Sequence, residues 1–153
     1  MNAEVREGIA LEYDRFGDPS DPPLLLVMGL GFQLIHWDPE FCQGLADRGF
    51  HVIRFDNRDV GLSTKIRGAP KPNLLAAAAG ASGSRPTVVL HGTTDPLVPP
   101  RAGRATAAAI PGAHLVELEG MGHDLPRQKW QQMTDAIVAN TEHAAQPQAS
   151  ALP

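Results

Sequence analysis

Two residues whose types suit acid–base chemistry, Asp95 and His123, each follow a predicted strand. Asp95 lies in the turn after the apolar stretch TVVLHG, and His123 follows the later stretch HLVELEG. Because open α/β sheets gather their sites at the carboxyl ends of parallel strands, we expect the two side chains to meet. A carboxylate that holds an imidazole in this way produces a general base of the kind used in hydrolytic triads.

A triad also needs a nucleophile, and the serines and the single cysteine are poorly placed for that role. Ser82 and Ser84 precede the strand that leads to Asp95, so a strand of ~17–20 Å separates them from the predicted site. Ser63 follows the carboxyl end of a strand and is the weak nucleophile candidate, although a structural turn role is the simpler interpretation. Cys42 is most simply an apolar residue packed inside a helix.

A metal site is a further alternative that the histidines and acidic residues raise. No two histidines have the i,i+4 or His-X-His spacing that is typical of metal motifs. We therefore expect no metal and no other cofactor, and the strand-end histidine His91 is expected to pack under the Asp95 turn. The residues that could still cluster are His36, His91, His114, His123, Asp95 and Asp124.

The elements that must position these residues follow a strand–helix–strand pattern. Apolar runs between proline and glycine predict strands, and amphipathic stretches behind capping residues predict helices. The run PLLLVMG suits a strand that is buried on both faces. The predicted elements are one or two hairpin strands in 8–23, strands at 24–28, 50–57, 87–91 and 114–119, and helices from Asp38 to Gly49, at 101–110 and from Pro126 onward.

The stretch 64–86 differs in character from the sequence on either side of it. It is rich in proline, glycine and alanine, so we expect a linker with one short helix near 73–79. We expect no strand in it, and no serine that reaches His123. The remaining prediction is one domain over 1–143 and a flexible tail over 144–153.

Four stretches in this order resemble the α/β-hydrolase fold family, especially its esterase and methylesterase-like members: LLLVMGLGFQLIHW, GFHVIRFDNRDVGLST, RPTVVLHGTTDPLVPP and IPGAHLVELEGMGHDLP. In that family a glycine-rich turn supplies an oxyanion amide, an acid follows a later strand, and a histidine follows the last strand. The resemblance implies Leu30 as the amide donor, Asp95 as the acid and His123 as the base.

One part of the family pattern is missing from this chain. The family carries its nucleophile in a G-x-S-x-G turn between the early and late stretches, and the linker leaves no room for it. The resemblance thus implies a reduced α/β-hydrolase fold, with a mostly parallel sheet flanked by helices on both faces. We expect the strand at 87–91 to pair with the strand at 24–28; otherwise open sheet edges favour a homodimer.

Composition narrows the classes of function. The net charge is −4, and the basic residues are scattered, which argues against nucleic acid as a partner. No apolar run approaches the length of a membrane span, and the acidic N-terminal stretch is unlike a signal peptide. We expect a cytoplasmic protein of a bacterial type that does not bind membranes.

The leading functional hypothesis is slow hydrolysis of small-molecule carboxylic esters or lactones by an Asp–His pair. Without an activated serine, we expect turnover at least a hundredfold slower than a typical kcat of about 10 s⁻¹. The first alternative is a non-catalytic remnant of the fold that binds a small ligand or a partner. A metal-dependent hydrolase is the third hypothesis.

Overall fold

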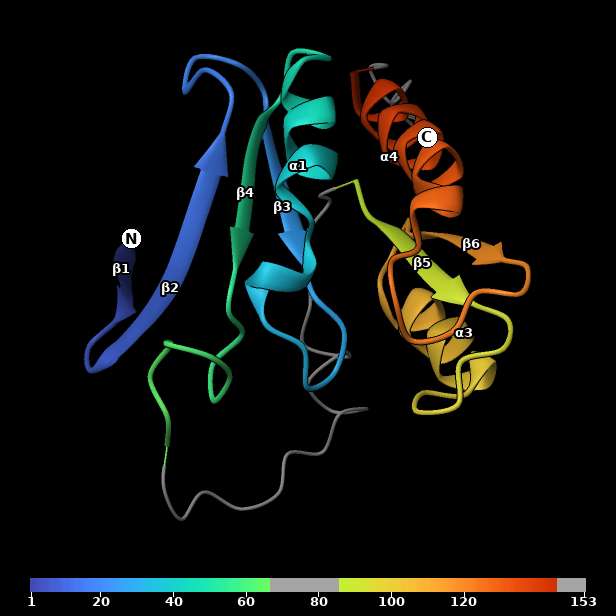
Figure 1. The fold of residues 1–153 in the computed structure, drawn as a ribbon, viewed down its shortest axis with the longest axis horizontal. Coiled ribbons are helices and arrows are strands. Elements are labelled where there is room, and N and C mark those ends of the chain that lie inside the picture. The colour runs from blue at the N-terminus through green and yellow to red at the C-terminus, as the bar shows by residue number, and fades with distance from the viewer. Residues whose placement is uncertain (67–85, 146–153) are drawn as a thin grey trace, which may run out of the picture. The chain divides into compact units, whose positions relative to one another are not determined.

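The chain forms two compact units, Met1–Pro70 and Lys71–Pro153, in a computed structural model that describes residues 1–66 and 86–145 (Figure 1). Their division falls inside the predicted linker 64–86, within what was predicted as one domain. Thr64, the first residue of the predicted linker, is bound to the first unit: its Oγ1 accepts a hydrogen bond from the Ala10 N–H at 2.9 Å. None of the helices that the structure describes is long and apolar enough to cross a membrane.

The first unit is built on a four-stranded sheet with the order β1-β2-β4-β3. β1 and β4 both lie antiparallel to β2, and β3 is parallel to β4. The prediction missed β1, because this edge strand is exposed at most positions and carries no apolar pattern. The strands are β1 (Asn2–Arg6), β2 (Ile9–Phe16), β3 (Pro23–Val27) and β4 (His51–Phe55).

Within the first unit, β3 is covered on one face, whereas its sequence predicted burial on both. Its central Leu26 is 4% exposed, whereas Leu25 and Val27 are 57% and 59% exposed. Since side chains alternate along a strand, only the Leu26 face is covered. Within this unit, the continuous apolar sequence of β3 therefore does not correspond to two buried faces.

The helix α1 (Pro39–Ala46) packs against β2 and β4 in the same unit. It begins where predicted, because the Asp38 carboxylate accepts a hydrogen bond from the Glu40 N–H at 2.8 Å and proline occupies the first turn. Phe41 and Leu45 on this helix are buried. A short 3-10 helix, η1 (Leu34–His36), precedes α1.

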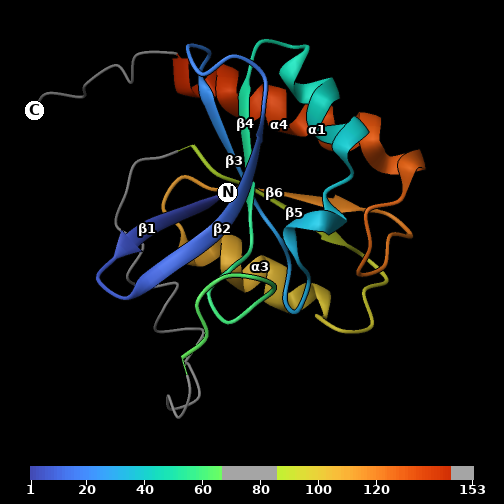
Figure 2. The same ribbon diagram turned by 60° about the vertical axis from the view of Figure 1, so that its left-hand side comes forward.

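The second unit contains two parallel strands, β5 (Val88–Gly92) and β6 (His114–Leu118). α3 (Pro100–Ala109) and α4 (Trp130–Ala145) pack on opposite faces of this pair, and the 3-10 helix η2 (Arg127–Lys129) precedes α4 (Figure 2). Helices on both faces were predicted, and this unit has them.

The expected pairing of the strand at 87–91 with the strand at 24–28 would join the two units and stays a prediction. Among residues 1–66 and 86–145, β5 pairs with β6, and β3 pairs with β4. Each strand thus finds its hydrogen-bonding partner within its own unit.

Candidate active site

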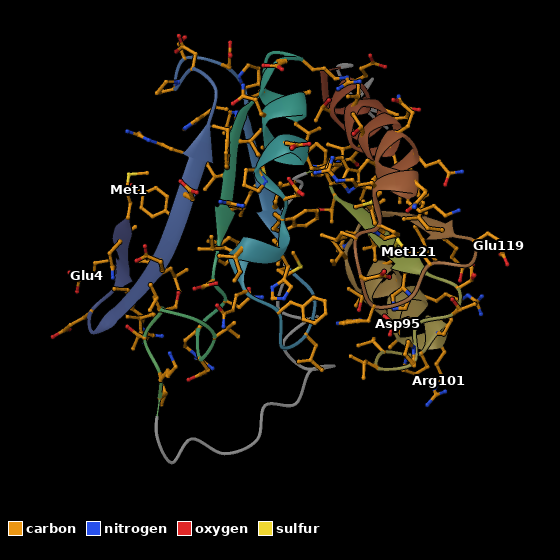
Figure 3. All side chains as sticks on the ribbon, in the orientation of Figure 1. Met1, Glu4, Asp95, Arg101, Glu119 and Met121 are labelled. Carbon is orange, nitrogen blue, oxygen red and sulfur yellow. The ribbon has the colours of Figure 1, made fainter. Side chains whose placement is uncertain are left out.

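Asp95 and His123 lie in the turns that follow β5 and β6, and their side chains are hydrogen-bonded. The His123 Nδ1 to Asp95 Oδ2 distance is 2.6 Å, and the side chains are 12% and 5% exposed, respectively. Figure 3 labels Asp95 together with Met121, which lies two residues before His123. The predicted contact between the acid and the histidine is confirmed; their catalytic role stays a prediction.

The other oxygen of the Asp95 carboxylate is held by its own turn. Oδ1 accepts hydrogen bonds from the N–H groups of Leu97 at 2.8 Å and Val98 at 2.9 Å. Burial opposes ionisation of Asp95, but these bonds and the adjacent His123 outweigh it, so the Asp95 pKa lies below its ordinary value. Since an ionised carboxylate can only accept, His123 Nδ1 carries the hydrogen of this bond, and in the neutral form of the ring Nε2 is then the nitrogen that can accept a proton.

The sequence reasoning missed three residues that join the two turns. They are Gly92, Thr93 and Thr94. Each threonine bonds the segment before His123 through its hydroxyl and its backbone N–H, and Gly92 lies close to the backbone of that segment. The sequence signal that could have indicated this role is their position, since they lie at the end of β5 and directly before Asp95.

His91 packs against α3. A Cβ added at Gly103 would lie 2.4 Å from His91 Cδ2, so the missing side chain makes room for the ring. Among the described residues there is no group of three or more histidine, cysteine or acidic side chains that could hold a metal ion.

Ser63 belongs to the first unit, and its hydroxyl is used by the backbone there. The side chain is buried, Oγ donates to the Asp56 carbonyl at 2.6 Å, and it accepts from the Glu12 N–H at 2.9 Å. These bonds tie the loop after β4 to β2. The structure thus does not support the nucleophile prediction for Ser63, because its hydroxyl is occupied as a structural link.

Replacing Ser63 with alanine is expected to destabilise the first unit. The variant leaves the Asp56 carbonyl and the Glu12 N–H without this partner, which costs about 1–3 kcal/mol of the free energy of unfolding. Urea titration measures the change. The control is Ser20→Ala, whose exposed hydroxyl donates to the Asp18 carboxylate at the surface; equal effects of the two variants would contradict the structural role.

Leu30 lies in the turn after β3, also in the first unit, and the residue is 68% exposed. The turn closes through a hydrogen bond from the Phe32 N–H to the Gly29 carbonyl at 3.3 Å, and Gly31 has a φ of 80° that favours glycine. The oxyanion role of Leu30 stays a prediction.

The remaining nucleophile candidates differ in what the structure says of them. Cys42 is fully buried, and burial raises the pKa of its thiol to about 11, as suits an apolar packing residue. Ser82, Ser84 and the helix predicted near 73–79 lie outside the described residues. From 86 to 145 the sequence has neither serine nor cysteine.

The family model Abhydrolase_4, described as TAP-like protein, matches residues 65–145, just over half of the chain. The chain belongs to the Abhydrolase_4 family. The matched region of this Abhydrolase_4 chain includes both Asp95 and His123.

Two curated relatives of this Abhydrolase_4 chain are methylesterases of Streptomyces. It is 38% identical over 68 residues to rhodomycin D methylesterase DauP of Streptomyces sp. (strain C5), and 37% identical over 68 residues to rhodomycin D methylesterase DnrP of Streptomyces peucetius. Each match covers 44% of this chain and 23% of the relative. The Abhydrolase_4 chain thus matches less than a quarter of the length of these relatives.

Solved structures show the same fold at low identity. A hydrolase from Pseudomonas aeruginosa PA01 aligns with a TM-score of 0.67 and 16% identity, over 92% of this chain and 97% of that one. The enol-lactonase from Burkholderia xenovorans LB400 aligns with a TM-score of 0.64 and 17% identity, over 93% of this chain and 100% of that one. The Abhydrolase_4 chain therefore has a reduced α/β-hydrolase fold, as predicted.

Proposed function

We propose that this protein hydrolyses carboxylic esters of small molecules, with His123 as the general base and Asp95 as the residue that orients it. The observation that carries the proposal is the 2.6 Å bond between His123 Nδ1 and Asp95 Oδ2, within the region that matches the family. The names of the Streptomyces relatives favour methyl esters, and lactones are the second substrate class.

In the proposed reaction, His123 Nε2 takes a proton from a water molecule as the water oxygen attacks the ester carbonyl carbon. The ionised Asp95 stabilises the imidazolium that forms. The tetrahedral intermediate then expels the alcohol oxygen, which receives the proton back from Nε2, so an acid and an alcohol leave.

The reaction is proposed to be slow, because water takes the place of a serine nucleophile. The described part of the second unit contains no serine or cysteine that could form an acyl-enzyme. General acid–base assistance contributes typically 10²–10⁴-fold, so hydrolysis remains measurable with a good leaving group.

The test is hydrolysis of p-nitrophenyl acetate by the wild type and by His123→Ala, with and without a chelator. We expect turnover by the wild type, loss to the uncatalysed background in His123→Ala, and no effect of chelator. The control is His114→Ala, which removes an exposed histidine at the start of β6 and should retain the wild-type rate.

Two results would contradict this function. Equal rates for the wild type and His123→Ala would leave the non-catalytic binding protein as the better hypothesis. Loss of the rate on chelation would favour the metal-dependent hydrolase.

A further inference from the structure

We propose that Gly92, Thr93 and Thr94 form a clasp that holds His123 in place for its reaction. The inference rests on the proposed function, because it assigns positioning residues to the same base. The paired strands β5 and β6 end at Gly92 and Leu118. The clasp begins there and leads to the hydrogen-bonded side chains of Asp95 and His123.

The first part of the clasp continues the strand ladder for one further residue. The Thr93 N–H donates to the Leu118 carbonyl at 3.1 Å, and Thr93 Oγ1 accepts from the Gly120 N–H at 2.9 Å. Gly120 has a φ of 69°, and the Met121 N–H donates back to the Leu118 carbonyl at 3.2 Å. The turn after β6 is thereby folded against Thr93.

The second part of the clasp lies directly beside the catalytic pair. The Met121 carbonyl accepts two hydrogen bonds from Thr94, one from the backbone N–H at 3.1 Å and one from Oγ1 at 3.0 Å. Met121 is 5% exposed, so this carbonyl belongs to a packed part of the turn. Thr94 directly precedes Asp95 in the chain, and Met121 lies two residues before His123. The hydrogen bonds between Thr94 and Met121 therefore fix the spacing between the acid and the base.

The third part is a close approach of two backbones. A Cβ added at Gly92 would lie 2.2 Å from the Met121 carbonyl oxygen and 2.5 Å from that of Gly122. Both atoms belong to the backbone of the turn that leads to His123, so any side chain at Gly92 displaces that turn. The glycine thus sets how near the two turns come.

A purely structural role would also explain these contacts, so the test needs a readout at the base itself. Positioning matters steeply in catalysis, and a displacement of about 1 Å can cost about a hundredfold in rate. The direct readout is the proton on His123 Nδ1, observed by NMR in protein with isotope-labelled histidine. Its resonance and its exchange with water report the bond to Asp95 independently of turnover.

The experiment compares the double variant Thr93→Val/Thr94→Val with Thr93→Ser/Thr94→Ser. Valine keeps the shape of threonine and removes the hydroxyl, whereas serine keeps the hydroxyl. In the valine variant we expect faster exchange of the Nδ1 proton and a kcat lower by between about tenfold and a hundredfold at unchanged KM. The serine variant should show the Nδ1 proton exchange and the kcat of the wild type. The matched control is Thr106→Val, which removes an exposed hydroxyl bonded to the Ala102 carbonyl within α3.

Two outcomes would overturn the clasp: a valine variant with the wild-type Nδ1 resonance and exchange, or a serine variant as impaired as the valine variant. Failure of the proposed function is distinguishable from both. If the wild type does not hydrolyse esters, the proposed function fails, while the Nδ1 proton still decides whether the threonine hydroxyls hold the pair together.

Discussion

Asp95→Asn is expected to reduce ester hydrolysis to the level of His123→Ala. The asparagine keeps the shape of the carboxylate but loses its charge, and its N–H₂ group can donate to Nδ1. That donation favours the tautomer in which Nε2 carries the hydrogen, so the base can no longer take a proton. In triad hydrolases the same change lowers kcat by roughly ten-thousandfold. Initial rates with p-nitrophenyl acetate measure the loss.

The control for the lost charge is Asp124→Asn, which removes an exposed carboxylate next to His123 in sequence. It has the same effect on net charge, and we expect a rate within about threefold of the wild type, because screened surface charges interact weakly. If Asp95→Asn retained the rate as well as Asp124→Asn does, the carboxylate of Asp95 would have no part in the reaction.

Gly92→Ala is expected to impair both hydrolysis and stability. The added methyl group meets backbone oxygens at 2.2 Å and 2.5 Å, which are not the ends of flexible side chains, so the turn before His123 must move. Overpacking of this kind typically costs about 1–3 kcal/mol of the free energy of unfolding. The displaced base should lower kcat by about a hundredfold or more. Thermal unfolding and initial rates measure the two effects.

The matched glycine is Gly44 in α1, where the nearest atom of the described residues to an added Cβ, the neighbouring helix backbone aside, is Arg48 Nη1, at 4.0 Å. Gly44→Ala should stabilise the protein by roughly 0.5–1 kcal/mol, because alanine is the better helix former. A Gly92→Ala variant with the thermal unfolding and the hydrolysis rate of the wild type would show that a side chain fits between the two turns, and this would contradict the close approach of Gly92 to Met121.

The acid–histidine pair could be predicted from sequence because its signals are local. Asp95 and His123 each follow an apolar run that ends in a turn, and the ends of parallel strands lie at one edge of a sheet. α1 was predictable for the same reason, since Asp38 and Pro39 mark its first turn. Residue type and spacing were enough in these cases.

Features that depend on contacts distant in sequence were not predictable. The approach of Gly92 to Met121 joins two turns, and nothing in either turn alone indicates it. Ser63 lies correctly after a strand end, yet its role depends on Glu12 and Asp56, which only the folded sheet brings to it. β1 was missed because an exposed edge strand needs no apolar pattern.

The central claim, that His123 activates water without a covalent intermediate, is tested most directly by intact-protein mass spectrometry during ester turnover. The sample is quenched with acid while p-nitrophenyl acetate is being hydrolysed in the steady state, and Asp95→Asn is treated in parallel. We predict that product accumulates in the wild-type sample while the protein keeps its unmodified mass. An acetylated species that forms and decays at the turnover rate, located on a serine by peptide mapping, would contradict the account.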